Sequence, residues 1–230
     1  EISKVVHVED WIRGDEKASK SLRRSKTTSM GLAIASVATG DADAVVSAGN
    51  SGALLAMSIF GLRKLPGISR PALAAVMPTI SGEIVALDLG ANIDCSSQNL
   101  IDFSVMGIVF AQNVLGRPNP RVAFLNIGEE DNKGKSIIHE ASNIMKNSPY
   151  ASFYKGYVEG DKVISGNFDV VVCDGFSGNV MLKTAEGTAK LCADYLKQVF
   201  TSSILGKISY LLGRSSFLGI RKKMDPRKHN

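Results

Sequence analysis

The chain of 230 residues has few of the side chains that build metal or redox sites. It has three histidines and three cysteines (Cys95, Cys173 and Cys192), and no two cysteines have CxxC spacing. The cysteines therefore predict neither a disulfide framework nor a zinc site. His139 is followed by Glu140 but lacks the second histidine of a zinc protease motif. Because Cys173 lies in an apolar strand-like run, we expect a buried, unreactive thiol there. We expect no metal and a reducing, cytoplasmic environment.

Long apolar runs and nucleotide-binding motifs are also missing. No uninterrupted apolar stretch approaches the roughly 20 residues that cross a bilayer, and no GxGxxG motif indicates a common dinucleotide site. Gly128–Ser136 resembles a phosphate-binding P-loop, but the spacing between its glycines is one residue too long. Three acidic residues lie between those glycines and would repel a nucleotide's phosphates. The sequence predicts no cofactor and no nucleic-acid partner.

Positive charge is concentrated in two segments of a chain whose net charge is +5. Residues 201–230 contain one acid, Asp225, and seven basic residues, which are Lys207, Arg214, Arg221, Lys222, Lys223, Arg227 and Lys228. This tail favours an acidic partner or an anionic membrane surface. The segment Glu9–Lys26 carries Arg13, Lys17, Lys20, Arg23, Arg24 and Lys26. It is either a solvated surface or a docking surface for an acidic protein.

Strand-like apolar runs alternate with segments of ten or more residues that have helical character. The expected strands are Ile2–Val8, Ala44–Ser47, Leu73–Met77, Ile84–Leu89, Arg121–Asn126, Phe153–Val158 and Asp169–Cys173. The expected helices are Thr28–Thr39, Ala53–Leu65, Ser97–Leu115, Lys135–Lys146 and one that follows Asp174 to about Phe200. This alternation predicts an α/β fold with a mostly parallel sheet. We expect residues 1–200 to form the core and residues 201–230 a basic amphipathic helical tail.

Two stretches, 43–55 and 169–182, repeat one construction. Six residues recur at a constant offset of 126 positions, namely Asp43/Asp169, Val45/Val171, Val46/Val172, Gly49/Gly175, Ser51/Ser177 and Gly52/Gly178. Each stretch reads as a strand, a glycine turn and a helix, and helix N-termini attract anions. The second copy has Asp174 where the first has Ala48. The turns are either two anion sites or independent tight connections.

Several longer motifs resemble those of one family. They are Ser47-Ala-Gly-Asn-Ser-Gly-Ala, Arg70-Pro-Ala-Leu-Ala-Ala-Val, Leu87-Asp-Leu-Gly-Ala-Asn-Ile-Asp-Cys, Leu125-Asn-Ile-Gly-Glu-Glu and Val172-Cys-Asp-Gly-Phe-Ser-Gly-Asn-Val. From about His7 to Pro226 the chain is similar to the PlsX family, the acyl-acyl carrier protein:phosphate acyltransferases of bacterial phospholipid synthesis. The family's N-terminal strand with its Gly-Gly-Asp turn, and its final C-terminal segment, have no counterpart here.

The resemblance implies a doubly wound α/β sheet like that of the isocitrate and isopropylmalate dehydrogenases, and a homodimer. It also implies conversion of acyl-acyl carrier protein and inorganic phosphate to acyl phosphate and free carrier protein, without a metal or cofactor. The product would be handed to a membrane-bound glycerol-3-phosphate acyltransferase. The apolar and cationic segment Ile204–Ile220 would then attach to an anionic membrane or contact a second subunit.

Specific residues receive roles from the motifs. Asp174 is the candidate base, Asn179 would orient the tetrahedral centre, and Lys133, in the family's Glu-Glu-x-x-Lys-Gly segment, would stabilise negative charge. The residues expected to hold phosphate or substrate are Ser47, Asn50, Ser51, Gly52, Asn92, Gly175, Ser177 and Gly178.

Three other functions remain open from the sequence. A phosphotransacetylase-like enzyme would take the acyl group from coenzyme A. An NAD-linked hydroxyacid dehydrogenase shares the expected fold, although a clear pair of aspartate metal ligands is missing. A membrane adaptor without turnover is the non-catalytic alternative.

Overall fold

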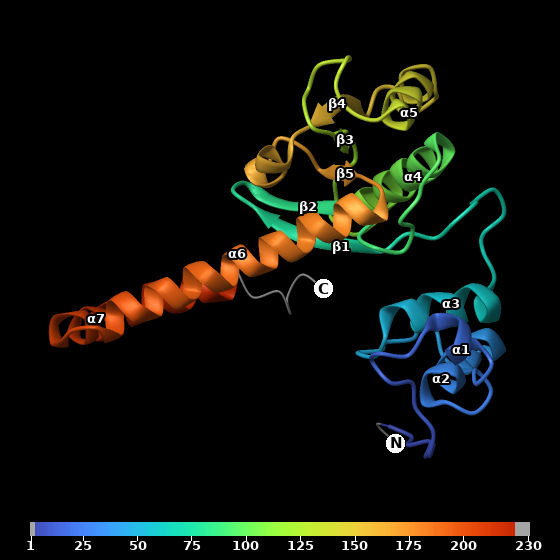
Figure 1. The fold of residues 1–230 in the computed structure, drawn as a ribbon, viewed down its shortest axis with the longest axis horizontal. Coiled ribbons are helices and arrows are strands. Elements are labelled where there is room, and N and C mark those ends of the chain that lie inside the picture. The colour runs from blue at the N-terminus through green and yellow to red at the C-terminus, as the bar shows by residue number, and fades with distance from the viewer. Residues whose placement is uncertain (1–2, 224–230) are drawn as a thin grey trace. The chain divides into compact units, whose positions relative to one another are not determined.

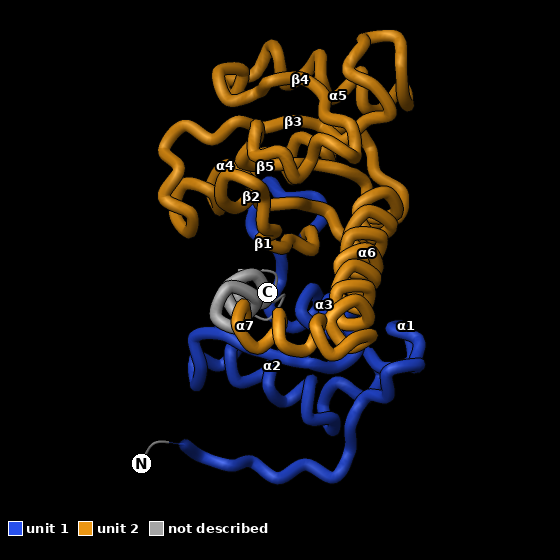
Figure 2. The backbone as a smooth tube through the Cα atoms, turned by 90° about the vertical axis from the view of Figure 1, so that its left-hand side faces the viewer, with its two compact units in different colours: residues 1–71 blue, residues 72–230 orange. Residues whose placement is uncertain are grey.

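The computed structural model describes residues 3–223, and its side chains are described up to residue 213. The chain divides into two compact units, residues 1–71 and residues 72–230 (Figure 2). The expected basic tail therefore lies partly outside the described residues, including Asp225, Arg227 and Lys228.

Unit 1 is built from three helices, α1 (Ala18–Leu22), α2 (Ser29–Thr39) and α3 (Ser51–Leu62). A small core of Ile12, Met30, Ile34, Ala53 and Met57 lies between them. The expectation of a helix from Thr28 that stops at Gly40 is confirmed, because Thr28 caps α2 and Gly40 ends it in the left-handed conformation.

The two strands expected in unit 1, Ile2–Val8 and Ala44–Ser47, are wrong over the residues that the structure describes. Residues 3–8 and 44–47 form no ladder, and only an isolated bridge joins Asp10 to Thr28. Val5 and Val46 are 91% and 96% exposed. A β-branched run becomes a strand only when a partner strand pairs with its backbone, and the described part of unit 1 offers none.

Unit 2 contains a five-stranded sheet of order β1-β2-β5-β3-β4 (Figure 1). The strands are β1 (Ala74–Thr79), β2 (Gly82–Leu87), β3 (Val122–Leu125), β4 (Tyr154–Val158) and β5 (Val170–Val172). β1 and β2 form an antiparallel hairpin, and the other neighbours pair in parallel. The expected strands of this part of the chain are confirmed, apart from shifts of one or two residues at their ends.

Helices cover both faces of this sheet. On one face α4 (Ser97–Asn113) and α5 (Ser136–Lys146) pack on a cluster that includes Leu87, Phe124 and Val172. On the other face the start of α6 (Gly175–Thr201) and the short helix η1 (Gly160–Ser165) pack on Ala86, Val171 and Ala123. The alternation of residues 170–172 between the two clusters follows from the two-residue period of a strand. The doubly wound α/β fold is confirmed.

Three loops meet at one edge of the sheet because β2, β5 and β3 run in parallel. Leu87, Val172 and Phe124 lie in one row across these strands. The loops that follow them therefore leave the sheet side by side, at the edge where α/β proteins bind ligands. The loops after Leu89, Asn126 and Cys173 therefore share an edge. The loop after Ser47 belongs to unit 1.

An ion pair joins the amino-terminal ends of β3 and β5, at the edge of the sheet opposite these loops. The Arg121 backbone N–H and Nε donate to Asp169 Oδ2 at 2.8 and 2.9 Å, and the Asp169 side chain is buried. Burial by itself raises the pKa of Asp169, but the hydrogen bonds from Arg121 outweigh it and hold the pKa below its usual value. The pair thus fixes the register of the two central strands.

We expect Asp169→Asn to lower the free energy of unfolding by about 2 kcal/mol at neutral pH, because the buried Asp169 side chain loses the charge that pairs with half-exposed Arg121. A lowered folded pKa stabilises the fold above the unfolded pKa, and this contribution disappears as the pH falls through the folded value. The difference between wild type and variant should therefore shrink below about pH 4 in urea unfolding experiments. Asp43→Asn, at the exposed equivalent in the first stretch, should change little at any pH, and equal losses in both variants would contradict the assignment.

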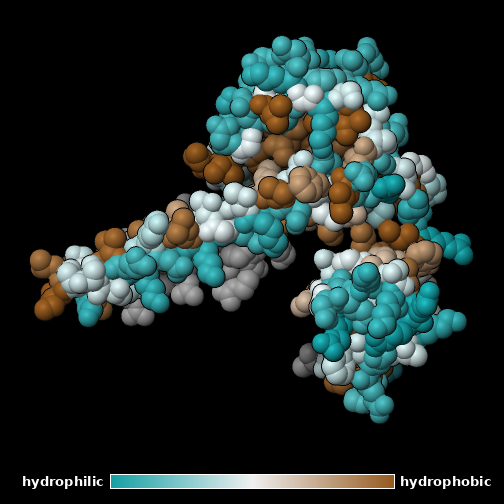
Figure 3. Space-filling model, viewed as in Figure 1, coloured by the Kyte–Doolittle hydropathy of each residue, from teal (hydrophilic) through white to brown (hydrophobic). Residues whose placement is uncertain are grey.

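The C-terminal half of α6 extends beyond the sheet. From Leu191 to residue 213 nearly every side chain is exposed, and α7 (Ile204–Lys223) folds back against α6 (Figure 1). The first turn of α7 carries exposed Ile204 and Leu205, and Figure 3 shows hydrophobic surface at that end. Within the described residues, neither this pair nor any other helix combines the length and apolarity needed to cross a membrane. The helix expected to run to about Phe200 ends at Thr201.

Candidate active site at the carboxyl edge of the sheet

Asp174 lies where β5 gives way to α6. As the N-cap of α6 it accepts a hydrogen bond from the Ser177 backbone N–H at 2.7 Å, and its Oδ2 accepts one from Lys135 Nζ at 2.8 Å. The carboxylate is buried. Burial raises its pKa, but the hydrogen bonds from Lys135 and Ser177 outweigh that effect and lower the pKa below its usual value. Asp174 is therefore a charged, firmly held carboxylate at neutral pH.

The partner of Asp174 comes from the loop after β3, whose shape depends on Asn126. The Nδ2 of Asn126 donates to the carbonyl oxygens of Gly128 and Lys133 at 3.0 and 2.8 Å. Its buried Oδ1 has no hydrogen-bond partner and lies against Gly134, where any side chain would overlap it. Gly134 also has φ +101°, so glycine suits this position on two grounds. The loop then delivers Lys135, the residue before α5, to Asp174.

A second buried carboxylate, Asp88, organises the loop after β2. Its Oδ1 accepts hydrogen bonds from the backbone N–H groups of Leu73 and Ala91 at 2.8 and 3.1 Å. Its Oδ2 accepts from the backbone and side chain of Asn92 at 2.6 and 2.9 Å. The Asn92 carbonyl in turn accepts from the Gly175 N–H at 2.7 Å. The loops after β2 and β5 therefore touch through Asn92 and Gly175.

Close packing explains the last glycine of the Asp-Gly-Phe-Ser-Gly motif. A Cβ on Gly178 would overlap the Asp88 carbonyl oxygen and would lie 2.8 Å from Cys173 Sγ. Only glycine lets the first turn of α6 approach the end of β2 this closely. Gly178 and Ser177 were both predicted to bind substrate. In the structure Gly178 is buried and lets α6 pack against the end of β2, and the Ser177 backbone N–H donates to Asp174.

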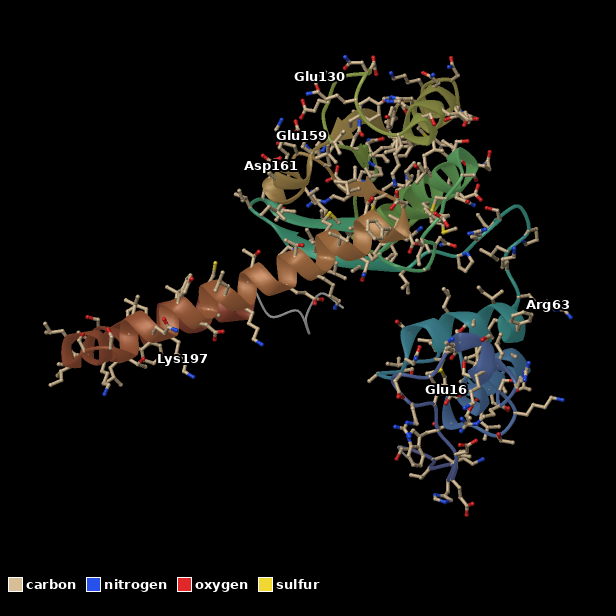
Figure 4. The ribbon with its side chains drawn as sticks, in the orientation of Figure 1. Glu16, Arg63, Glu130, Glu159, Asp161 and Lys197 are labelled. Carbon is tan, nitrogen blue, oxygen red and sulfur yellow. The ribbon has the colours of Figure 1, made fainter. Side chains whose placement is uncertain are left out.

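The other predicted catalytic residues lie nearby but make different contacts. The Nζ of Lys133 pairs with Glu130 Oε1 at 2.9 Å, and this contact raises the pKa of Lys133. Glu130 lies toward the same end of unit 2 as Glu159 (Figure 4). Its neighbour Glu129 and Glu159 both accept hydrogen bonds from Lys162 Nζ. Asn179 is exposed on α6 and packs beside Gly90. The cation in contact with Asp174 is therefore Lys135, two residues beyond the predicted Lys133.

The first repeated stretch lies in unit 1 and differs in its geometry. Asn50 caps α3 by accepting from the Ala53 N–H at 2.9 Å, and its Nδ2 donates to the carbonyls of Gly14 and Glu16, both at 3.0 Å. α3 begins at Ser51, whereas α6 begins at Gly175, the counterpart of Gly49. Within the repeat, the helix of the first copy thus starts two residues later than that of the second, and two residues before the expected Ala53. Ser51 and Gly52 are exposed, and Ser47 accepts from the Gly49 N–H at 3.2 Å.

Sequence reasoning missed Lys135, Asp88 and Asn126. Asp88 and Asn126 stood inside quoted motifs directly after strands, which was the available signal. Lys135 had a weaker one, its place as the last residue before a helix on the loop after β3. Burial raises the pKa of Cys173 and keeps its thiol protonated, as expected. Among the described residues, no group of His, Cys, Asp and Glu side chains is arranged to hold a metal ion.

Comparison with known proteins agrees with this geometry. The model of a family described as fatty acid synthesis protein matches residues 2–230. A phosphate acyltransferase of Rhodospirillum centenum is 51% identical over 229 residues, which are 100% of this chain and 64% of that protein. A phosphate acyltransferase of Granulibacter bethesdensis is 50% identical over 98% of this chain and 61% of its own length. The chain thus spans a little under two thirds of these relatives.

Two solved structures share the fold at low sequence identity. The EutD phosphotransacetylase from Staphylococcus aureus has a TM-score of 0.56 and 18% identity, over 75% of this chain and 63% of its own. A branched-chain phosphotransacylase from Enterococcus faecalis has a TM-score of 0.52 and 19% identity, over 75% of this chain and 66% of its own. Both likenesses concern the fold alone.

Proposed function

The chain belongs to the fatty acid synthesis protein family, and from that premise we propose that the protein is a phosphate acyltransferase. It would transfer the acyl group of acyl-acyl carrier protein to inorganic phosphate and release acyl phosphate and free carrier protein. The relatives' names support the reaction type. The structural observation that carries the proposal is the Asp174–Lys135 pair at the carboxyl edge of the sheet.

The reaction assigns a task to each group at this edge. A phosphate oxygen attacks the thioester carbonyl carbon, a C–O bond forms, the C–S bond breaks, and the carrier thiolate leaves and is protonated. Asp174 would accept the proton that phosphate loses, and Asn179 would orient the tetrahedral centre. Lys135 supports this placement, since its ammonium sits beside the proposed base and attracts phosphate. No metal or cofactor takes part in this scheme.

The remaining predicted residues keep proposed roles. Lys133 would stabilise the developing charge after leaving Glu130, with which it pairs at the surface. Asn92, Gly175, Ser177 and Gly178 would shape the phosphate site around Asp174. In unit 1, Ser47, Asn50, Ser51 and Gly52 would hold phosphate or the pantetheine phosphate at the start of α3. The Asn50 side chain already bonds to the backbone of Gly14, Glu16 and Ala53. A phosphate at this position would therefore accept hydrogen bonds from the backbone N–H groups at the start of α3.

The choice of acyl donor tests the function. The full-length protein should release acyl phosphate from acyl-acyl carrier protein only when phosphate is present, and less efficiently from acyl-coenzyme A. Exposed Lys17, Lys20, Arg23 and Lys26 in unit 1 are proposed to dock the acidic carrier. Lys20→Glu with Arg23→Glu should therefore raise KM for the carrier-protein donor and leave KM for acyl-coenzyme A unchanged. A preference for acyl-coenzyme A would favour the phosphotransacetylase alternative.

We further propose a cytoplasmic protein that attaches peripherally to an anionic membrane through α7 and dimerises through α6. Apolar Ile208, Leu211 and Leu212 are exposed on α7 beside basic residues, which suits a membrane surface. Apolar Leu191, Tyr195 and Val199 are exposed on α6, from which Lys197 also projects (Figure 4), and suit a second copy. Attachment would place the product near a membrane-bound glycerol-3-phosphate acyltransferase.

Leu211→Glu with Leu212→Glu should abolish co-sedimentation with vesicles that contain anionic lipid, because two exposed leucines proposed to enter the membrane interface would become charged. Ile80→Glu, at an exposed isoleucine in the β1–β2 turn, is the matched control and should bind as wild type does. The double variant should remain a dimer in sedimentation equilibrium, since α6 is intact. Unchanged vesicle binding by the double variant would remove α7 as the attachment site.

A further inference from the structure

Three large apolar side chains are exposed at the carboxyl edge of the sheet. Ile93 is 67% exposed in the loop after β2, Ile127 is 77% exposed in the loop after β3, and Phe176 is 61% exposed just after β5. Ile93 and Ile127 belong to loops and Phe176 to the first turn of α6, yet all three segments leave the sheet at the same edge. Exposed apolar surface that gathers in one place indicates a binding surface.

Contacts on the backbone bring these side chains into one region. The Gly175 N–H donates to the Asn92 carbonyl at 2.7 Å. Phe176 directly follows Gly175 and Ile93 directly follows Asn92, so these two residues lie on segments that touch. Phe124 pairs with Val172 across β3 and β5. Ile127 follows Phe124 at the same separation as Gly175 follows Val172. Ile127 and Phe176 thus lie three and four residues beyond a pair of facing strand residues, in neighbouring segments that leave the sheet at one edge.

The same loops carry the charged pair of the proposed active site. Asp174 is two residues before Phe176. Lys135, which pairs with Asp174, is the last residue of the loop that contains Ile127. A charged centre thus borders an apolar surface. Such a surface matches a ligand with an anionic head and a hydrocarbon tail better than it matches phosphate alone.

We propose that Ile93, Ile127 and Phe176 form an apolar subsite for the acyl chain of the substrate, an inference that rests on the proposed function. The first carbons of the chain lie across these side chains while the thioester carbonyl is held beside Asp174 and Lys135. The subsite favours long acyl chains over short ones, because each methylene that leaves water adds to affinity.

Binding of two alkyl phosphates tests the subsite without turnover. Ethyl phosphate and decyl phosphate share the anionic head and differ in their hydrocarbon chain. In calorimetric titrations of the full-length protein, decyl phosphate should bind on the order of tenfold more tightly than ethyl phosphate. Ile127→Ser and Phe176→Ser should each reduce this ratio by roughly threefold or more while ethyl phosphate affinity stays unchanged. Exposed side chains are chosen so that both variants fold.

Ile80→Ser is the matched control, because Ile80 is 87% exposed in the β1–β2 turn, at the opposite edge of the sheet from Ile127. It should keep the wild-type ratio. The same ratio in all variants would overturn the subsite and leave the proposed function standing. Failure of the wild type to bind either phosphate, combined with no phosphate-dependent release of acyl phosphate, would overturn both.

Discussion

Gly178→Ala is expected to lower the free energy of unfolding of unit 2 by about 3 kcal/mol or more. The added methyl group would overlap the Asp88 carbonyl oxygen and press on Cys173 Sγ. A flexible side chain can move aside, but the Asp88 carbonyl is backbone at the end of β2. The start of α6 must therefore shift away from the sheet, and with it Asp174. Urea unfolding followed by circular dichroism measures the loss.

Gly187→Ala is the matched control in the same helix. A Cβ at Gly187 meets no atom within 4 Å, so the substitution only exchanges glycine for the best helix former. It should leave stability unchanged or raise it by up to about 1 kcal/mol. Equal effects of the two substitutions would mean that α6 does not begin against β2 as described.

The sheet of unit 2 was predictable because its strands are short apolar runs between helical segments. Val170, Val171 and Val172 are buried on both faces, and such runs keep their strand character wherever they pair. Val5 and Val46 have the same local preference but no partner strand in the described residues, and they are not strands. Strand formation depends on long-range pairing, which a local pattern does not contain.

The loops of the candidate site were also predictable, but the contacts within them were not. The repeated construction and the family motifs identified Asp174, Asn92 and the glycines, and the structure brings Asn92 and Gly175 together at one edge of the sheet. The partner of Asp174 depends on the path of the loop after β3, which Asn126 and Gly134 determine together. Lys133 and Lys135 are indistinguishable by composition, and only the direction of the loop assigns Lys135 to Asp174.

The charge of Asp174 has the largest expected effect on activity. Asparagine caps helices as well as aspartate does, so Asp174→Asn preserves the hydrogen bond from Ser177 while it removes the negative charge and the hydrogen bond from Lys135. We expect the rate of acyl phosphate release by the full-length protein to fall about 10²–10⁴-fold, as for loss of a general base. Stability should change by less than about 1 kcal/mol. Asp174→Ala removes the cap as well and should cost about 1 kcal/mol more.

The pH dependence separates a base from a merely structural cap. Because the pKa of Asp174 lies below its usual value, the wild-type rate should not fall through protonation of this carboxylate until the pH drops below about 4. Lys135→Gln removes the hydrogen bond that most strongly opposes the effect of burial, so the pKa of Asp174 must rise. The acid limb of the rate profile should then move to higher pH in Lys135→Gln and be absent in Asp174→Asn. A near-wild-type rate in Asp174→Asn, with an acid limb that does not respond to Lys135, would reduce Asp174 to the cap of α6.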